Sequence, residues 1–334
     1  MARVGTRKDL EQQIAALNAL RGDPEQPAGR TLLVSALDAA RAPLCAAAAN
    51  IIAEAELTGF EAQLVAAFER WEHAPAKSDP GCAAKTSLIR ALYKVGAREH
   101  AVYVRGIKLV QHEPAWGGSN DSAVELRGLC ALALVQTDYY DALLEIAELL
   151  ADPEPIARIA AARAVGHSPR GDAALPLLRL KVRLGDVDAR VAGACFSGLL
   201  SLAPDSEFER VAAYVYSGGS EVAEAALLAL GESRSARALP LLRKAAESAL
   251  ASELRAFAYA AIAQLRSDEA WDYLLGVLRD ESDAIASEAL TALSAYRSLD
   301  SMRERVLAAA RARGRGPVLT RAESLFARDV APGG

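Results

Sequence analysis

The sequence predicts an all-α protein that folds as a right-handed α-α superhelix, a stack of helical hairpins. A nine-residue apolar skeleton recurs with steps of 31, 32, 33, 32 and 31 residues, starting at Arg127, Arg158, Arg190, Ala223, Arg255 and Ala286. A period of this size indicates stacked supersecondary units that bury their apolar faces against one another. The hydrophobic fraction of 52% comes mainly from Ala and Leu, with only 5% aromatic residues. This composition favours closely packed helices over strands.

The first 112 residues predict a cap followed by irregular repeats. The cap, residues 1–29, contains a helix at 9–20 with an apolar stripe that includes Leu10 and Leu17, and Gly22-Asp23-Pro24 ends it. Residues 30–112 carry weaker copies of the repeat, with a polar linker at 73–81. Their helices are expected at 30–41, 43–57, 59–72, 82–96 and 98–110.

The segment 111–120 is the longest connection inside the array, and we expect a loop there. It places Trp116 near Glu113 and before a Gly-Gly pair. An exposed Trp in a loop is typical of a contact site, because Trp is a preferred interface anchor. Alternatively, Trp116 folds back and fills the gap left by the irregular repeat. Asp121 or Ser122 is expected to cap the helix that follows.

Regular repeats are expected over 113–312 and a cap over 313–334. Each repeat is predicted to contain a first and a second helix. The first helices are predicted near 122–136, 154–166, 187–202, 220–231, 252–265 and 283–296. The second helices are predicted, in the same order, near 138–150, 171–184, 205–217, 235–249, 267–279 and 299–312. Turn residues such as Asp152-Pro153 and Gly218-Gly219 separate them. A last helix is expected at 318–328, before a tail at 331–334 that is expected to fray.

Small and basic residues recur at fixed places in these repeats. Short side chains let helix axes approach, and they are expected where paired helices meet, at Ala161, Ala162, Ala226, Ala258 and Ala289. Arg127, Arg158, Arg190 and Arg255 share one position, and acidic residues precede the first three. We interpret them as structural pairs between neighbouring repeats, because a ladder for an anionic ligand would not need acidic partners at the same interval.

The repeat pattern resembles HEAT repeats, in particular the bacterial type also found in phycobilisome lyase-like proteins. The resemblance rests on Asp188 and Arg190, on the segments 158–166 and 223–231, and on second helices that contain Ala-Leu-Pro-Leu-Leu-Arg from 174 and from 238. It extends over 122–312 and is weaker over 30–112. The resemblance implies an α-solenoid of the armadillo-like kind, and such arrays serve as partner-binding scaffolds, lyases, a hydroxylase or DNA glycosylases. Fold alone does not choose among these functions.

Charge and composition narrow the function classes. A net charge of −5 spread along the chain disfavours general binding of nucleic acid. One basic segment with few acids is expected at the C-terminal end, at Arg303, Arg305, Arg311, Arg313, Arg315 and Arg321. The N-terminus does not match a signal peptide, and no apolar run reaches bilayer length, which together predict a cytoplasmic protein without membrane contact. The widely spaced Cys45, Cys82, Cys130 and Cys195 are expected to be buried free thiols.

The sequence contains no motif that indicates catalysis. It lacks a P-loop, a dinucleotide-binding glycine motif, a nucleophile elbow and a His-Glu-x-x-His metal motif. His112-Glu113 is the one His-Glu pair, whereas the HEAT-like hydroxylases that the chain resembles use several to hold iron. We therefore expect no metal and no cofactor.

The leading hypothesis is a non-enzymatic scaffold that binds a partner protein on a concave face lined by second helices. The alternative is a HEAT-like enzyme of the lyase or DNA-glycosylase type. The partner's identity and the oligomeric state stay open at this point. Helical spacing and the 111–120 loop give the candidate contact residues Glu113, Trp116, Arg179, Lys181, Arg183, Tyr214, Tyr216, Arg243, Lys244, Asp272 and Tyr273.

Overall fold

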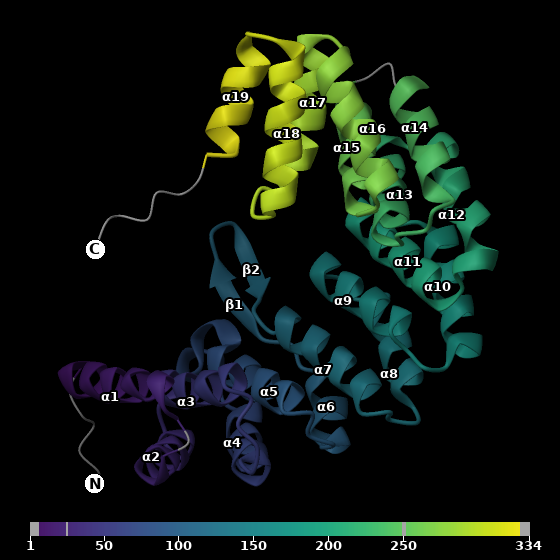
Figure 1. The fold of residues 1–334 in the computed structure, drawn as a ribbon. Helices are drawn as coiled ribbons and strands as arrows, with labels where there is room; N and C mark the ends of the chain where they lie inside the picture. Colours follow the sequence, from purple (N-terminus) through teal and green to yellow (C-terminus); the bar gives the residue numbers. More distant parts are fainter. Residues whose placement is uncertain (1–6, 25, 249–251, 328–334) are drawn as a thin grey trace, which may run out of the picture. The chain divides into compact units, whose positions relative to one another are not determined.

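The computed structural model describes residues 7–24, 26–248 and 252–327, so the predicted tail at 331–334 lies outside the described residues. The chain divides into two compact units, unit 1 (Met1–Leu177) and unit 2 (Leu178–Gly334). The described residues form nineteen α-helices, three short 3₁₀ helices and one two-stranded sheet (Figure 1). The prediction of an all-α helical repeat fold is confirmed, and the small sheet is an addition to it.

Unit 1 begins with helices that match the predicted cap and irregular repeats. They are α1 (Arg7–Ala19), α2 (Pro27–Leu37), α3 (Ala42–Glu54), α4 (Glu61–Glu72), α5 (Ala83–Lys94) and α6 (His100–Gly106). The 3₁₀ helices are Leu20–Gly22, Ala76–Ser78 and Pro80–Cys82. The sheet consists of β1 (His112–Ala115) and β2 (Gly118–Asp121), and α7 (Val124–Gln136), α8 (Ala142–Leu149) and α9 (Pro155–Gly166) follow it.

The remaining helices also begin and end close to their predicted positions. Helix α10 (Gly171–Leu184) spans the boundary between the two units. Unit 2 then contains α11 (Ala189–Leu202), α12 (Pro204–Ser217), α13 (Ser220–Glu232), α14 (Ala238–Ser248), α15 (Ser252–Gln264), α16 (Asp268–Asp280), α17 (Asp283–Ser294), α18 (Asp300–Arg313) and α19 (Pro317–Leu325).

The helices pair differently from the sequence prediction. In unit 2, α12 packs mainly on α13, and α14 packs mainly on α15 rather than on α13. The packed hairpin is therefore a second helix with the first helix of the next predicted pair. The predicted period is right, but the predicted pairing is shifted by one helix.

First helices pack closely on the next first helix over α3 to α9 and over α11 to α15. Extensive contacts join α3 to α5 and α7 to α9 in unit 1, and α11 to α13 and α13 to α15 in unit 2, whereas α12 and α14 make few contacts with each other. Second helices contact each other further along unit 2, between α16 and α18. The expectation that second helices line a concave face stays a prediction.

Small side chains permit this close packing. The predicted contact alanines, including Ala162 and Ala226, are all fully buried. Glycines contribute at the same crossings, because a Cβ atom on Gly128 would lie 2.7 Å from the Cβ of Ala160. A Cβ atom on Gly231 would overlap the backbone of Ala261 on the neighbouring first helix, α15. Backbone atoms cannot move aside as a side-chain tip can, so Gly231 has the strictest size limit of these positions.

Replacing Gly231 by alanine is expected to lower the free energy of unfolding by about 1–3 kcal/mol, because the added methyl group forces α13 and α15 apart. Gly276→Ala is the matched control, since a Cβ atom there meets nothing within 4 Å. This control is expected to be neutral or to stabilise by up to about 1 kcal/mol, because alanine favours the helix. Urea denaturation of both variants checks the difference; equal stabilities would show that the crossing tolerates a methyl group.

Arginine side chains link neighbouring repeats on the chain. Arg105 on α6 pairs with Glu72 on α4 at 3.1 Å, and Arg237, just before α14, pairs with Glu209 on α12 at 2.8 Å. Further links of this kind, each about one repeat long, are Arg70 to the carbonyl of Leu37, Arg170 to the carbonyl of Tyr140, and Arg313 to Asp283. These bonds connect each repeat to the one before it.

Most of the arginines that recur at one repeat position form structural bonds, as the sequence predicts. Arg127 is buried between Asp121 and Asp152, and Arg255 pairs with Glu288 of the next repeat at 2.8 Å. Arg158 donates to the carbonyls of Asp152 and Pro153. Arg190 differs, because its exposed side chain pairs with Asp188 two residues earlier instead of with a neighbouring repeat.

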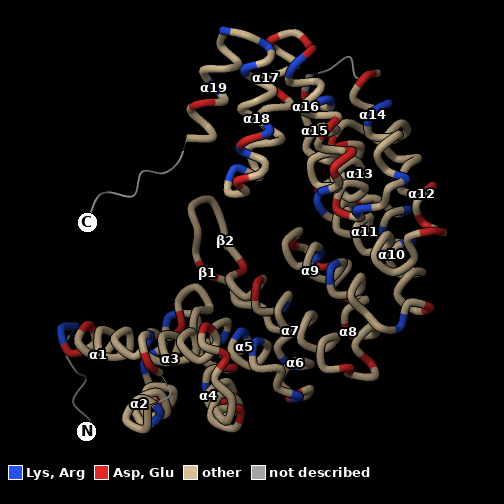
Figure 2. The backbone as a smooth tube through the Cα atoms, viewed as in Figure 1, with Lys and Arg blue, Asp and Glu red and all other residues tan. Residues whose placement is uncertain are grey.

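Three of the six arginines in the predicted basic segment at the C-terminal end are paired with acids, and Arg321 donates to the Thr291 hydroxyl. Arg303 pairs with Asp300, Arg305 with Asp272 at 2.7 Å, and Arg313 with Asp283. Figure 2 shows basic and acidic residues interspersed along these helices. Two of these acids precede their arginines by 30 residues or more. The sequence near the arginines therefore does not show that their charges are neutralised.

Candidate functional site

The segment predicted as a loop forms an antiparallel β-hairpin. Its register pairs His112 with Asp121 and Ala115 with Gly118, and this leaves Trp116 and Gly117 as the two turn residues. Gly117 has a φ of +87°, a backbone conformation that glycine adopts without a steric penalty. The prediction of an irregular loop at 111–120 is therefore wrong.

Trp116 lies at the tip of this hairpin and is fully exposed, with a relative accessibility of 106%. The alternative in which Trp116 fills a gap in the packing is wrong. Figure 1 shows the hairpin projecting from the N-terminal end of α7. A large indole held in water at a tight turn contributes nothing to the core, which makes it the strongest candidate contact residue on unit 1.

Glu113 belongs to the base of the hairpin and not to its contact surface. Its Oε1 accepts hydrogen bonds from the backbone N–H of Gly81 at 2.7 Å, from the Ser122 hydroxyl at 2.6 Å and from the Gln111 amide at 2.8 Å. The bond from Ser122, followed by that from Gln111, holds the pKa of Glu113 below its ordinary value. The prediction that Glu113 contacts a partner is replaced by an anchoring role.

Beneath the hairpin lies a group of buried polar side chains, which we call the anchor cluster: Asp79, Lys85, Gln111, Asp121 and Arg127. The Lys85 ammonium is 1% exposed, lies 3.6 Å from a carboxylate oxygen of Asp79 and donates to the Gln111 side chain. The Gln111 amide in turn donates to the carbonyl of Asp79 at 2.9 Å. These bonds tie the start of the hairpin to the loop before α5.

Asp121 completes the anchor cluster at the other end of the hairpin. Its Oδ1 accepts from the backbone N–H groups of Gln111 and Ala123, and its Oδ2 accepts from Arg127. Burial opposes ionisation of Asp121, but the hydrogen bonds from Gln111, Ala123 and Arg127 outweigh it, and the pKa lies below its ordinary value. Asp121 accepts from the N–H of Ala123, the residue before α7, and the Ser122 hydroxyl bonds to Glu113 and to the Gln111 carbonyl, so the predicted side-chain cap on α7 is not formed.

Most of the anchor cluster is absent from the residues that the sequence singles out. Asp79 falls in the predicted polar linker, yet it is fully buried and its carboxylate accepts from the backbone N–H of Ala84 and Lys85 at the start of α5. The one residue that could have revealed the anchor cluster from the sequence is Lys85, a charged residue inside the run Cys82-Ala-Ala-Lys-Thr-Ser-Leu-Ile. A lysine on the buried stripe of a helix requires a partner of opposite charge.

The candidate residues on the second helices pair largely with one another. In unit 2, Lys244 lies 5.9 Å from the ring of Tyr216, and Arg243 lies 4.5 Å from the ring of Tyr273. Asp272 pairs with Arg305. These contacts run from α12 through α14 and α16 to α18, so they join neighbouring repeats.

The other candidates on the second helices also contact described residues of this chain, except for Arg183. Arg179 forms an ion pair with buried Glu207, and Lys181 pairs with Asp186 at 2.9 Å. The Tyr214 ring packs on Phe196 with 4.9 Å between centroids. Arg183 is exposed. The structure therefore spreads these candidates over α10, α12, α14 and α16 instead of gathering them into one site.

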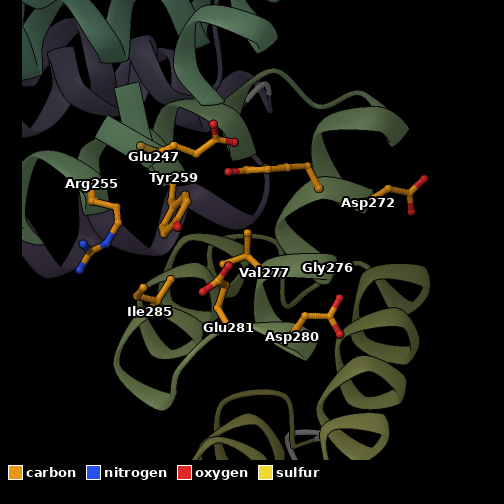
Figure 3. A pocket seen from close by; sticks show the side chains of 11 residues that line it. Glu247, Arg255, Tyr259, Asp272, Gly276, Val277, Asp280, Glu281 and Ile285 are labelled. Atoms are coloured by element: carbon orange, nitrogen blue, oxygen red, sulfur yellow. The ribbon is translucent and has the colours of Figure 1, made fainter. Parts of the chain in front are cut away.

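A pocket of about 560 Å³ opens in unit 2 between α14, α15, α16 and α17. Tyr273 lines it together with Tyr259, Val277, Glu247 and Glu281. Figure 3 shows the last four of these residues. Only Asp272 and Tyr273 among the lining residues are candidates from the sequence. Several of the others escape sequence reasoning because they come from a first helix, such as Tyr259, or from a helix end, such as Glu247 and Asp280.

The sequence profile of HEAT repeats matches residues 209–294, which cover α13 to α17 and most of α12. This chain contains HEAT repeats. The helix pairing seen in the matched HEAT segment continues through the described helices on both sides of it. No curated protein matches the sequence.

Several solved structures are similar to this HEAT-repeat chain. Escherichia coli YibA is 17% identical with a TM-score of 0.37, over 70% of this chain and 97% of YibA. An engineered protein is 17% identical with a TM-score of 0.35, over 96% of both chains. The complex of CpcE and CpcF of phycocyanin lyase from Nostoc sp. PCC7120 gives 18% identity and a TM-score of 0.29, over 89% of this chain and 92% of the other.

The cysteines of the HEAT-repeat chain are buried free thiols, as predicted. Burial raises the pKa of Cys45 to about 12 and that of Cys82 to about 11, which suppresses the reactive thiolate. Within the described residues, no three His, Cys, Asp or Glu side chains are grouped as metal ligands would be. No helix in that part of the chain combines the length and apolar character needed to span a bilayer.

Proposed function

We propose that this protein is a non-enzymatic interaction scaffold that captures a partner protein through the hairpin tip, with Trp116 as the anchor residue. The observation that carries the proposal is the contrast within the hairpin. Its base is fixed by the buried anchor cluster, while Trp116 at its tip is fully exposed. A rigid loop loses little conformational entropy on binding, and a buried Trp is the residue type that most often dominates interface energy.

The expected partner surface is an apolar pocket with few charges. The hairpin from Pro114 to Asn120 carries no charged residue, and the segment is exposed on the described structure. HEAT repeats generally serve as protein-interaction scaffolds, which agrees with this proposal. The proposal places the contact on the hairpin and not on the second helices, because the charged groups there are mostly occupied by their neighbours.

Replacing Trp116 by alanine is expected to reduce partner capture roughly tenfold or more and to leave the melting temperature unchanged, because the indole makes no stabilising contact. The measurement is affinity capture from a lysate of the source organism with quantitative mass spectrometry, followed by titration of the captured protein. Tyr140→Ala is the matched control, since Tyr140 is another aromatic residue of unit 1 and is 77% exposed.

The proposal fails if the Trp116 variant and the Tyr140 variant retain every stoichiometric partner equally. Analytical ultracentrifugation of the wild type and the Trp116 variant identifies the case in which the partner is a second copy of the chain. In that case the wild type sediments as a dimer and the variant as a monomer.

A further inference from the structure

The pocket of unit 2 is built from two kinds of surface. Tyr259 on α15 and Tyr273 on α16 supply aromatic walls, and Val277 and Ile285 supply apolar ones. Figure 3 shows Glu247 and Glu281 on opposite sides of the space that Tyr259 and Val277 face. A cavity that combines aromatic, apolar and acidic groups has the composition of a site for an organic cation.

Most other charged groups around this pocket are neutralised by close partners. Three ion pairs account for them: Arg255 with Glu288, Asp272 with Arg305, and Asp280 with Arg279. The side chains of Glu247 and Glu281, in contrast, form no ion pair or hydrogen bond within the described residues. Two unpaired carboxylates therefore border the pocket against one cation, Arg243, whose guanidinium lies 4.5 Å from the Tyr273 ring. This leaves a net negative potential where a bound cation would lie.

Tyr259 provides a second and independent indication of a ligand. The residue is 4% exposed and lines the pocket, yet its hydroxyl makes no hydrogen bond within the part of the chain that the structure describes. Burial raises the pKa of Tyr259 to about 12, so the hydroxyl is neutral at physiological pH. The hydroxyl is open to the pocket, and a ligand with N–H donors would supply the hydrogen bond that no described protein group supplies.

We propose that this pocket binds an organic cation, an alkyl-ammonium or guanidinium group, between Glu247 and Glu281. The Tyr259 hydroxyl accepts a hydrogen bond from the cation, and Val277 and Ile285 contact its alkyl chain. Both free alkylamines and the basic side chains of a peptide have this chemistry. The site contains no hairpin residue, so it can be tested independently of the proposed function.

Isothermal titration calorimetry on the full chain tests the proposal with two sets of probes. The free amines are agmatine and cadaverine, with 1,5-pentanediol as the neutral counterpart. The peptides are acetyl-Gly-Lys-Gly-amide and acetyl-Gly-Arg-Gly-amide, with the Gln peptide as the neutral counterpart. Saturable binding of the cations, and none of the neutral probes, is the expected result. Binding of the amines alone identifies a small molecule as the ligand, whereas binding of the peptides identifies a basic side chain.

Single substitutions then test whether the cation binds in this pocket. Glu281→Gln is expected to weaken cation binding about tenfold or more, because it removes one of two charged acceptors. Tyr259→Phe is expected to weaken it several-fold, since only the hydroxyl is lost. Glu221→Gln, an exposed carboxylate on α13 outside the pocket, is the matched control and is expected to bind like wild type. Circular dichroism confirms that each variant is folded.

Two results would overturn this inference. One is the absence of saturable binding for every cationic probe with the wild-type chain. The other is equal affinity in the Glu281 and Glu221 variants, which would mean that the cations associate with the acidic surface in general.

Discussion

Replacing Lys85 by methionine is expected to lower the free energy of unfolding by about 3–5 kcal/mol, because the change leaves the Asp79 carboxylate buried without its cation. Lys85 is 1% exposed and Asp79 is fully buried, so water cannot compensate for the loss. The Gln111 side chain loses a donor in the same step. Urea denaturation followed by far-ultraviolet circular dichroism measures the effect.

A double variant separates the charge effect from the loss of packing. Lys85→Met combined with Asp79→Asn removes both charges, and the introduced amide keeps an oxygen for the backbone N–H groups at the start of α5. The double variant is expected to be more stable than Lys85→Met alone, which gives a measurable coupling energy. Lys94→Met, at the exposed end of the same helix, is expected to change stability by less than about 0.5 kcal/mol. Equal loss in both lysine variants would contradict the assignment of a buried ion pair.

Replacing Ala162 by tryptophan is expected to destabilise the protein by roughly 1–3 kcal/mol or more, because Ala162 on α9 is fully buried and offers no space for an indole. Arg163→Trp places the same side chain at the adjacent exposed position of α9 and serves as the control. Thermal unfolding of the two variants should differ clearly. A wild-type melting temperature for the Ala162 variant would refute the packing described for α7 and α9.

The helices could be predicted from the sequence because their signals are local. Apolar residues at helical spacing, Pro at the first turn and Gly or Asp between repeats placed α9 and α13 to within one residue of their observed bounds. The sequence could not predict which of its two neighbours each second helix packs on. A constant period fixes how often a helix recurs, but it does not tell whether α12 packs on the helix before it or on the helix after it.

The hairpin could not be predicted because its strands contain residues that disfavour strands. Pro114, Ala115 and Gly118 give no β signal, and the backbone conformation comes from side chains beneath the hairpin. Those side chains, Asp79 and Gln111, are separated by 32 residues and carry no recognisable motif. The exposure of Trp116 is one of two alternatives that the sequence allows, and only the structure distinguishes them.

The arginine links between repeats have a consequence for how the chain acquires its structure. The bonds of Arg105 to Glu72 and of Arg237 to Glu209 each join residues about thirty positions apart. Such a bond can close as soon as the next helical hairpin has emerged from the ribosome, and it does not wait for the C-terminus. Synthesis from the N-terminus therefore lets each new hairpin dock on a finished neighbour, so the nascent chain exposes only its latest apolar face at any time.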